Sequence, residues 1–492
     1  MNASNWIKDR ITTVERDRHL CDGRDFIDDE GISQRLATAT PTLSFVRDIL
    51  EKSLAIETLT LDETAALLNV KDPELRREME DTALKVKLKV YDNRIVTFAP
   101  LYLSNKCVNG CLYCSFRKEN ALKRRVLTMN EIRREVQVLA GEIGHKRLIV
   151  VFGEHPESAV EYMCEAMEAL YSVKIPGRKG GSQIRRANVN AAPMKVDELR
   201  LLKSAGIGTY QVFQETYDRR VYDRVHPKGT LKNDWRWRLY CMHRAFEAGV
   251  DDVGIGALFG LNADWRFEVM GLLSHSRELE KRYGVGPHTI SFPRMVNAAN
   301  APLANAGSLV DDDAFRHLVT VLRLAVPHTG MILTCRENAE MRRRTIPLGI
   351  TQTDASSKIG LGDYEKSGKS QEAERQQFIL GDTRSLDEVV RELTLMGFIT
   401  SFCTAGYRCH RTGEKIMKML KSGREGQFCK LNAVITFREW LNDFASPTTK
   451  RLGEALIRKE MAEIDQISPE RRLRQFKEYY KRTEDGERDL YF

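Results

Sequence analysis

The sequence predicts a (β/α)8 barrel of the TIM type, with a helical extension at each end. Two observations predict it: strand-like apolar runs alternate with helix-like stretches from about residue 95 to residue 385, and there are eight such runs. This alternation is typical of a parallel sheet, and eight parallel strands close into a barrel. The runs are TFAPLYL (97–103), LIVVFG (148–153), ANVNA (187–191), TYQVF (209–213), VGIGALFG (253–260), HTISFPR (288–294), MILTCR (331–336) and ITQTDA (350–355).

The predicted elements divide the chain of 492 residues into three parts. Residues 1–94 are rich in charge, and we expect a mostly helical N-terminal extension. Residues 95–385 are expected to form the barrel, because stretches such as AVEYMCEAMEALYSV and AFRHLVTVLRLAV carry apolar residues at helical spacing between its strands. Residues 386–492 are expected to form a helical C-terminal extension. The active site of such a barrel lies at the C-terminal ends of its strands.

The composition narrows the function classes. The 77 basic residues are interleaved with 69 acidic ones, so the net charge of +8 describes a solvated surface and we expect no nucleic-acid partner. No run approaches the roughly 20 apolar residues that span a bilayer, so we expect no membrane association. Ten cysteines, in a chain whose start lacks the apolar core of a signal peptide, predict reduced thiols in the cytoplasm or another reduced intracellular compartment.

Three cysteines, Cys107, Cys111 and Cys114, are spaced C-x3-C-x2-C in the loop that follows the strand 97–103. Three thiolates can ligate three irons of a 4Fe-4S cluster and leave the fourth iron open to a small chelating molecule. A zinc site normally has four ligands, and this loop offers no fourth cysteine or histidine. The spacing therefore predicts a catalytic iron-sulfur cluster.

This loop, with Tyr113 before its last cysteine, resembles that of the radical S-adenosylmethionine enzymes. The resemblance implies that the open iron chelates S-adenosylmethionine, whose cleavage yields a 5'-deoxyadenosyl radical. A Gly-Glu pair after the second strand resembles the family's motif at that place, and polar residues end the third and fourth strands. The residues expected to contact this cofactor are Tyr113, Gly153, Glu154, Asn188, Asn190, Gln214 and Glu215.

Segments such as GIGTYQVFQETY, DDVGIGALFGL and GMILTCRE are similar to the HydG family of tyrosine lyases, over about residues 60–460. The likeness implies that the radical takes hydrogen from the amino group of L-tyrosine, and that the Cα–Cβ bond breaks to give p-cresol and dehydroglycine. Arg336 ends the strand 331–336 and is the candidate for binding the amino-acid carboxylate; the alternative is a structural pair with Glu337. The implied partners are L-tyrosine or a related aromatic amino acid, an electron donor such as ferredoxin or flavodoxin, and hydrogenase maturation proteins.

The family then converts dehydroglycine to carbon monoxide and cyanide at an auxiliary iron-sulfur cluster held by a C-x2-C-x22-C motif. Cys403 and Cys429 match its outer positions, Gly406 stands at the middle one, and Cys409 is the nearest replacement. His288 matches a histidine that ligates an extra iron in the family. Three alternatives stay open: an intact auxiliary cluster with both diatomic products, a tyrosine or tryptophan lyase without them, and an iron-sulfur scaffold without radical chemistry.

Overall fold

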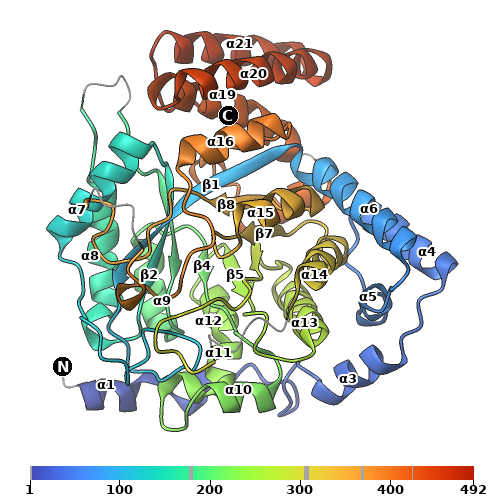
Figure 1. Ribbon diagram of the computed structural model, residues 1–492, viewed down its shortest axis with the longest axis vertical. Coiled ribbons are helices and arrows are strands. Elements are labelled where there is room, and N and C mark those ends of the chain that lie inside the picture. Colours follow the sequence, from blue (N-terminus) through green and yellow to red (C-terminus); the bar gives the residue numbers. More distant parts are fainter. Residues whose placement is uncertain (1–2, 177–180, 304–309, 367–370, 424) are drawn as a thin grey trace.

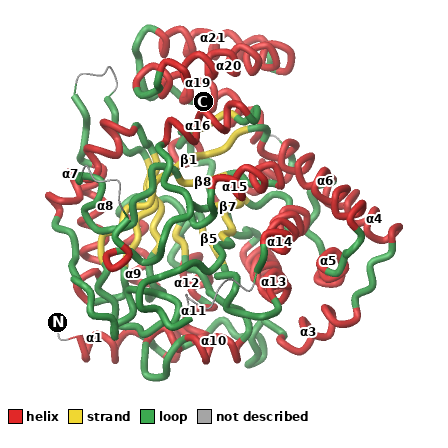
Figure 2. The backbone as a smooth tube through the Cα atoms, in the orientation of Figure 1, coloured by secondary structure: helices red, strands yellow, loops and turns green. Residues whose placement is uncertain are grey.

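The computed structural model describes residues 3–176, 181–303, 310–366, 371–423 and 425–492. Figures 1 and 2 show a central set of strands enclosed by helices. The strands are β1 (Arg94–Ser104), β2 (Arg147–Phe152), β3 (Arg186–Asn190), β4 (Tyr210–Gln211), β5 (Val253–Gly256), β6 (Thr289–Ser291), β7 (Gly330–Leu333), β8 (Gln352–Asp354) and β9 (Ile399–Ser401).

The strands β1 to β8 close into a barrel whose neighbouring strands are all parallel. The long strand β1 closes it, because Ala99 lies opposite Leu148 of β2 and Val96 lies opposite Gln352 of β8. Each of the predicted runs contributes one strand. The predicted (β/α)8 barrel is therefore confirmed.

Helices cover the outside of the barrel and extend beyond it (Figure 1). Those before the barrel are α1 (Ala3–Arg10), α2 (Thr13–Asp17), α3 (Asp29–Thr38), α4 (Leu43–Leu54), α5 (Leu61–Leu68) and α6 (Pro73–Tyr91). Those between its strands are α7 (Met129–Val138), α8 (Val160–Tyr171), α9 (Val196–Ser204), α10 (Arg219–Val225), α11 (Trp235–Leu239), α12 (Cys241–Glu247), α13 (Trp265–Tyr283), α14 (Asp312–Ala325) and α15 (Ala339–Thr345), with short turns of other helix types. Those after it are α16 (Leu386–Leu395), α17 (Ala405–Arg408), α18 (Gly413–Lys421), α19 (Glu425–Asp443), α20 (Pro447–Ile467) and α21 (Glu470–Glu484).

Local sequence signals explain where several helices begin. Thr128 caps α7 and Ser385 caps α16, and in both cases a glutamate three residues later returns the hydrogen bond. This reciprocal arrangement satisfies backbone N–H groups that have no partner within the first turn. Among the described helices, none is both long and apolar enough to cross a lipid bilayer.

The strand β9 corrects the expectation of a purely helical C-terminal part. It pairs in parallel with the first residues of β1, where Arg94 lies opposite Ile399, and α19 packs against it. Three residues are too short to show a strand period in the sequence, and β9 forms because β1 extends past the barrel and offers it an edge. The boundaries at residues 94 and 385 stay predictions.

Two cavities occupy opposite ends of the barrel. Inward side chains near the C-terminal ends of the strands line the larger cavity, for example Tyr102 of β1 and Asp354 of β8. Side chains at the N-terminal ends of the same strands line the smaller one, including Arg94 of β1 and Gln352 of β8. The apolar side chains of Phe98, Ile149 and Ile332 pack together between these levels.

Candidate functional site

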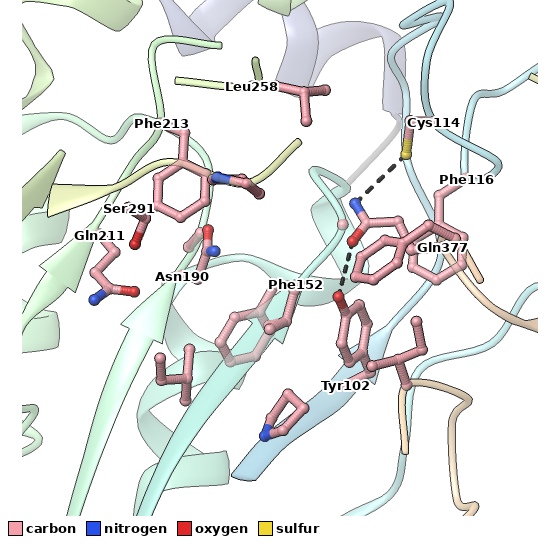
Figure 3. Close-up of a pocket in the computed structure, with 18 of the residues that line it drawn as sticks. Tyr102, Cys114, Phe116, Phe152, Asn190, Gln211, Phe213, Leu258, Ser291 and Gln377 are labelled. Atoms are coloured by element: carbon pink, nitrogen blue, oxygen red, sulfur yellow. Dashed lines mark hydrogen bonds between the residues drawn. The ribbon is translucent and has the colours of Figure 1, made fainter. Parts of the chain in front are cut away.

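The larger cavity lies where the active site of a barrel of this kind is expected. It encloses about 1480 Å³ of empty space, including open solvent. Cys107, Cys111 and Cys114 line it together. Residues from all eight barrel strands, or just beyond their C-terminal ends, complete the wall. Figure 3 labels several of them, among them Tyr102, Asn190 and Leu258.

The three thiols are suited to an iron-sulfur cluster. Cys111 is buried, and Cys107 and Cys114 are half-buried. Burial raises the pKa of all three thiols, that of Cys111 to about 11, so the thiolate forms require a bound cation such as iron. The amide nitrogen of Asn109 lies 3.7 Å from the Cys107 sulfur and donates to it. Such N–H donors stabilise cluster thiolates, and the residues present therefore fit a 4Fe-4S cluster.

The end of β2 fixes the cysteine loop. A Cβ atom at Gly153 would lie only 2.2 Å from the carbonyl oxygen of Lys106, so only glycine permits this approach. The backbone N–H of Val108 donates to the carbonyl oxygen of Glu154 over 2.9 Å. The side-chain amide of Asn109 also donates to the Glu154 carboxylate, over 2.6 Å. The Gly-Glu pair thus holds the loop by its backbone and presents a carboxylate to the cavity.

Glu215 carries the second carboxylate of the predicted set. Its oxygen accepts from the Lys232 ammonium over 2.6 Å and from the Arg238 guanidinium over 3.4 Å. Burial alone would raise the pKa of Glu215, but these two cations outweigh it and lower the pKa below its ordinary value. Beside them, the Tyr113 hydroxyl forms a hydrogen bond of 2.8 Å with a ring nitrogen of His226. Glu215 is therefore a fixed anion in the cavity wall, next to Tyr113.

Two predicted cofactor contacts lie elsewhere. Asn190 lines the cavity, but Asn188 does not, because its side-chain oxygen accepts from the backbone N–H of Thr209 over 3.0 Å. Gln214 is also absent from the lining and is 3% exposed. Its two neighbours, Phe213 and Glu215, both line the cavity, and the side chain of Gln214 does not. We therefore exclude Asn188 and Gln214 from the candidate site.

Arg336 lies three residues beyond the end of β7 and lines the same cavity. Its guanidinium stacks on the ring of Phe378, 3.5 Å from the ring centre. Glu337 is not its partner, because the Glu337 carboxylate accepts two hydrogen bonds from Arg294. Among the described residues, no carboxylate lies within ion-pair distance of Arg336, and Glu337 pairs with Arg294. Arg336 is thus available to a carboxylate that enters from outside.

The smaller cavity gathers the residues predicted for an auxiliary cluster. Cys403, Cys429, Gly406 and His288 all line it. Cys409 does not: it ends α17, and its backbone N–H donates to Ala405. Within the described part of the lining there are therefore two thiols and one imidazole, and these do not fit a cluster held by three thiolates.

Among the described residues of the larger cavity, nine polar ones were not predicted from the sequence. Tyr102 had a detectable signal, because it shares the inner face of β1 with Phe98 at a period of two residues. Lys232 lies in a single 3-10 turn (Leu231–Asn233) and Gln377 in a loop, and in neither segment does a periodicity identify the side chains that face a cavity. The nine residues are Tyr102, Asn109, Gln211, Lys232, Arg238, Ser291, Thr334, Asp354 and Gln377.

Comparisons with known proteins agree with this geometry. Residues 101–273 match the Radical SAM superfamily, and residues 291–399 match the Biotin and Thiamin Synthesis associated domain. A crystal structure of HydG, a maturase of the FeFe-hydrogenase, is 43% identical and superimposes with a TM-score of 0.89, over 95% of this chain and 100% of that chain. HydG from Carboxydothermus hydrogenoformans is 37% identical with a TM-score of 0.76, over 92% and 96% of the two chains. The 2-iminoacetate synthase of Escherichia coli (strain K12) is 31% identical over 349 residues, which are 71% of this chain and 88% of that protein.

Proposed function

Because the chain belongs to the radical S-adenosylmethionine superfamily, and within it to the HydG-like proteins, we propose that it cleaves the Cα–Cβ bond of L-tyrosine to p-cresol and dehydroglycine. The observation that carries this proposal is that the three cysteines of the cluster loop and Arg336 line one cavity. In this superfamily, a 4Fe-4S cluster with bound S-adenosylmethionine supplies a 5'-deoxyadenosyl radical. The name 2-iminoacetate synthase of the Escherichia coli relative supports a two-carbon imino acid as a product.

The residues of the chain take separate roles in this proposal. Cys107, Cys111 and Cys114 hold the cluster. Glu154 would accept hydrogen bonds from the amino group of S-adenosylmethionine, because it lies at the end of β2 beside the cysteine loop. Residues on the neighbouring wall of the cavity bind the nucleoside part, namely Tyr113, Asn190 and Glu215.

Arg336 orients the amino acid. Its guanidinium presents a planar pair of donors that matches a carboxylate, and the Phe378 ring holds that plane in place. The apolar floor of Phe98, Ile149 and Ile332 suits an aromatic side chain and keeps water from the cleaving bond. An aromatic amino acid held by its carboxylate thus lies in the same cavity as the cluster loop.

The second cavity supports a reaction that ends at p-cresol and dehydroglycine. Gly406 replaces the middle cysteine, and Cys409 lies outside the lining. Formation of carbon monoxide and cyanide is the second candidate, and the joint position of Cys403, Cys429 and His288 in that cavity favours it. In both cases the electron donor that we propose is a ferredoxin or a flavodoxin.

The test is an anaerobic assay of the full chain after reconstitution with iron and sulfide. S-adenosylmethionine, dithionite and L-tyrosine are added, and 5'-deoxyadenosine, p-cresol, carbon monoxide and cyanide are measured together, with L-tryptophan as the alternative substrate. We expect 5'-deoxyadenosine and p-cresol in equal amounts without the diatomic products. If the protein binds a cluster but forms no product that depends on tyrosine or tryptophan, the lyase function is contradicted. The alternative of an iron-sulfur scaffold without radical chemistry would then be supported.

Gly406→Cys provides a matched variant for the second candidate reaction, the formation of carbon monoxide and cyanide at an auxiliary cluster. A Cβ atom at this position meets only the Arg411 carbonyl oxygen, at an ordinary contact distance of 3.4 Å, so a cysteine fits. We expect the variant to bind about eight irons per chain, and the parent about four, because a third thiolate completes a second cube. Equal iron contents of about eight in both proteins would show that the parent already holds the auxiliary cluster.

A further inference from the structure

Gln377 joins the cysteine loop to the barrel wall. Its side-chain nitrogen lies 3.5 Å from the sulfur of Cys114, and its side-chain oxygen accepts from the Tyr102 hydroxyl over 2.8 Å (Figure 3). Cys114 comes from the cysteine loop, Tyr102 from β1, and Gln377 from the chain after β8. The strand β1 and the cysteine loop that follows it therefore meet a segment more than 260 residues later in the chain at one cysteine of the loop.

The Tyr102 hydroxyl and the Cys114 sulfur together favour one orientation of the Gln377 amide. A phenol O–H that donates to the amide oxygen leaves the NH2 group pointing the other way, toward Cys114. A thiolate sulfur is only an acceptor, so this orientation suits a cysteine that is bound to iron. The reverse orientation would place the amide oxygen against the negatively charged sulfur.

The backbone around Gln377 is also attached to the cysteine loop. The backbone N–H of Ser115 donates to the Gln377 carbonyl oxygen over 3.4 Å, and the Ser115 hydroxyl donates to the carbonyl oxygen of Gln376. The next residue, Phe378, supports the guanidinium of Arg336. The backbone from residue 376 to residue 378 is therefore held in place by Ser115 and by the stacking of Phe378 on Arg336, and this limits where the Gln377 side chain can reach.

We propose that Gln377 is a positioning residue that donates an N–H to the Cys114 thiolate and thereby raises the reduction potential of the cluster. This inference rests on the proposed function, since it requires a cluster on Cys107, Cys111 and Cys114. Hydrogen bonds to the sulfurs withdraw electron density and stabilise the reduced, more negative state, and they are among the factors that set cluster potentials. Gln377 thereby makes the cluster easier to reduce.

The test is a potentiometric titration of the reconstituted full-length protein, with the reduced cluster followed by electron paramagnetic resonance and iron content measured in parallel. Gln377→Leu removes the donor, and Gln377→Glu keeps the shape but replaces the donor with an anionic acceptor. We expect the midpoint potential to shift to more negative values in both variants, further in Gln377→Glu. Gln211→Leu is the control, because Gln211 lines the same cavity but donates to Thr289 and not to a sulfur; its midpoint should equal that of the parent.

Tyr102→Phe tests the orientation of the amide without touching Gln377. Removal of the hydroxyl frees the amide to rotate, so we expect a smaller shift in the same direction. Midpoints equal to that of the parent in both Gln377 variants, at equal iron content, would overturn the proposal. If the Gln377 variants do not retain iron, an unchanged midpoint in Tyr102→Phe overturns it and a negative shift supports it. The titration needs a bound cluster but no tyrosine cleavage, so a failure of the lyase proposal is recognised separately by the absence of p-cresol.

Discussion

Gly153→Ala is expected to disrupt the cluster site while the barrel still folds. The new Cβ atom would lie 2.2 Å from the Lys106 carbonyl oxygen and 3.5 Å from the Cβ atom of Cys107. To reach an ordinary contact of 3.4 Å, the two segments must separate by about 1.2 Å. The atom that must move belongs to the backbone of the residue before Cys107, so the first cluster ligand moves with it.

The size of the effect follows from this overlap. Overpacking of a buried position costs about 1–3 kcal/mol, which corresponds to about 5- to 150-fold weaker retention of the cluster if the strain is released by moving the loop. The assay measures iron and sulfide per chain and the yield of 5'-deoxyadenosine after anaerobic reconstitution. Circular dichroism of the metal-free protein checks that the barrel has formed.

Gly286→Ala is the matched control, because a Cβ atom there meets nothing closer than the Ser276 hydroxyl oxygen at 3.7 Å. It should keep the iron content and activity of the parent. If Gly153→Ala also keeps the full iron content and cleaves S-adenosylmethionine at the parent rate, then the close approach of β2 to the cysteine loop does not control the site. The reasoning from the Gly-Glu pair would then be refuted.

Three further predictions concern single side chains. Cys107→Ala should abolish 5'-deoxyadenosine formation, because two thiolates do not hold the 4Fe-4S cluster. Continued cleavage of S-adenosylmethionine by this variant would contradict the proposed mechanism. Arg336→Lys should raise KM for tyrosine about 10- to 100-fold in the p-cresol assay, because the bidentate carboxylate contact is lost, and an unchanged KM would remove Arg336 from the site. Burial alone would raise the pKa of Glu439, but Arg185 and Lys146 lower it to about 2. The interaction of the Glu439 carboxylate with Arg185 and Lys146 therefore stabilises the fold at pH values above the ordinary carboxyl pKa of 4.5. This stabilisation is lost as the pH falls from 4.5 toward 2. Glu439→Gln should cost on the order of 3 kcal/mol in denaturant unfolding at pH 7 and less at pH 3, and an equal loss at both pH values would exclude this role.

The sequence predicted the barrel, and it brought forward the three cysteines that line the larger cavity, but it predicted few of the other residues in the cavity wall. The alternation of strand-like and helix-like runs is repeated along the chain, so it predicted a strand even at β4, which contains only Tyr210–Gln211. The same pattern did not predict β9, which forms only because β1 extends beyond the barrel. Asn188 and Gln214 have suitable polarity at strand ends, yet the direction of each side chain depends on neighbours that the sequence does not identify.

The sequence by itself determined which cysteines are the candidate cluster ligands, because Cys107, Cys111 and Cys114 lie within one short loop whose spacing is a local, covalent property. The tertiary structure decided what surrounds them. Gln377 reaches the sulfur of Cys114 across 263 residues of sequence, and Glu337 pairs with Arg294 instead of its neighbour Arg336. Such contacts depend on how strands and loops pack around a closed barrel. The spacing of residues along the chain does not predict them, because the partners are distant in sequence.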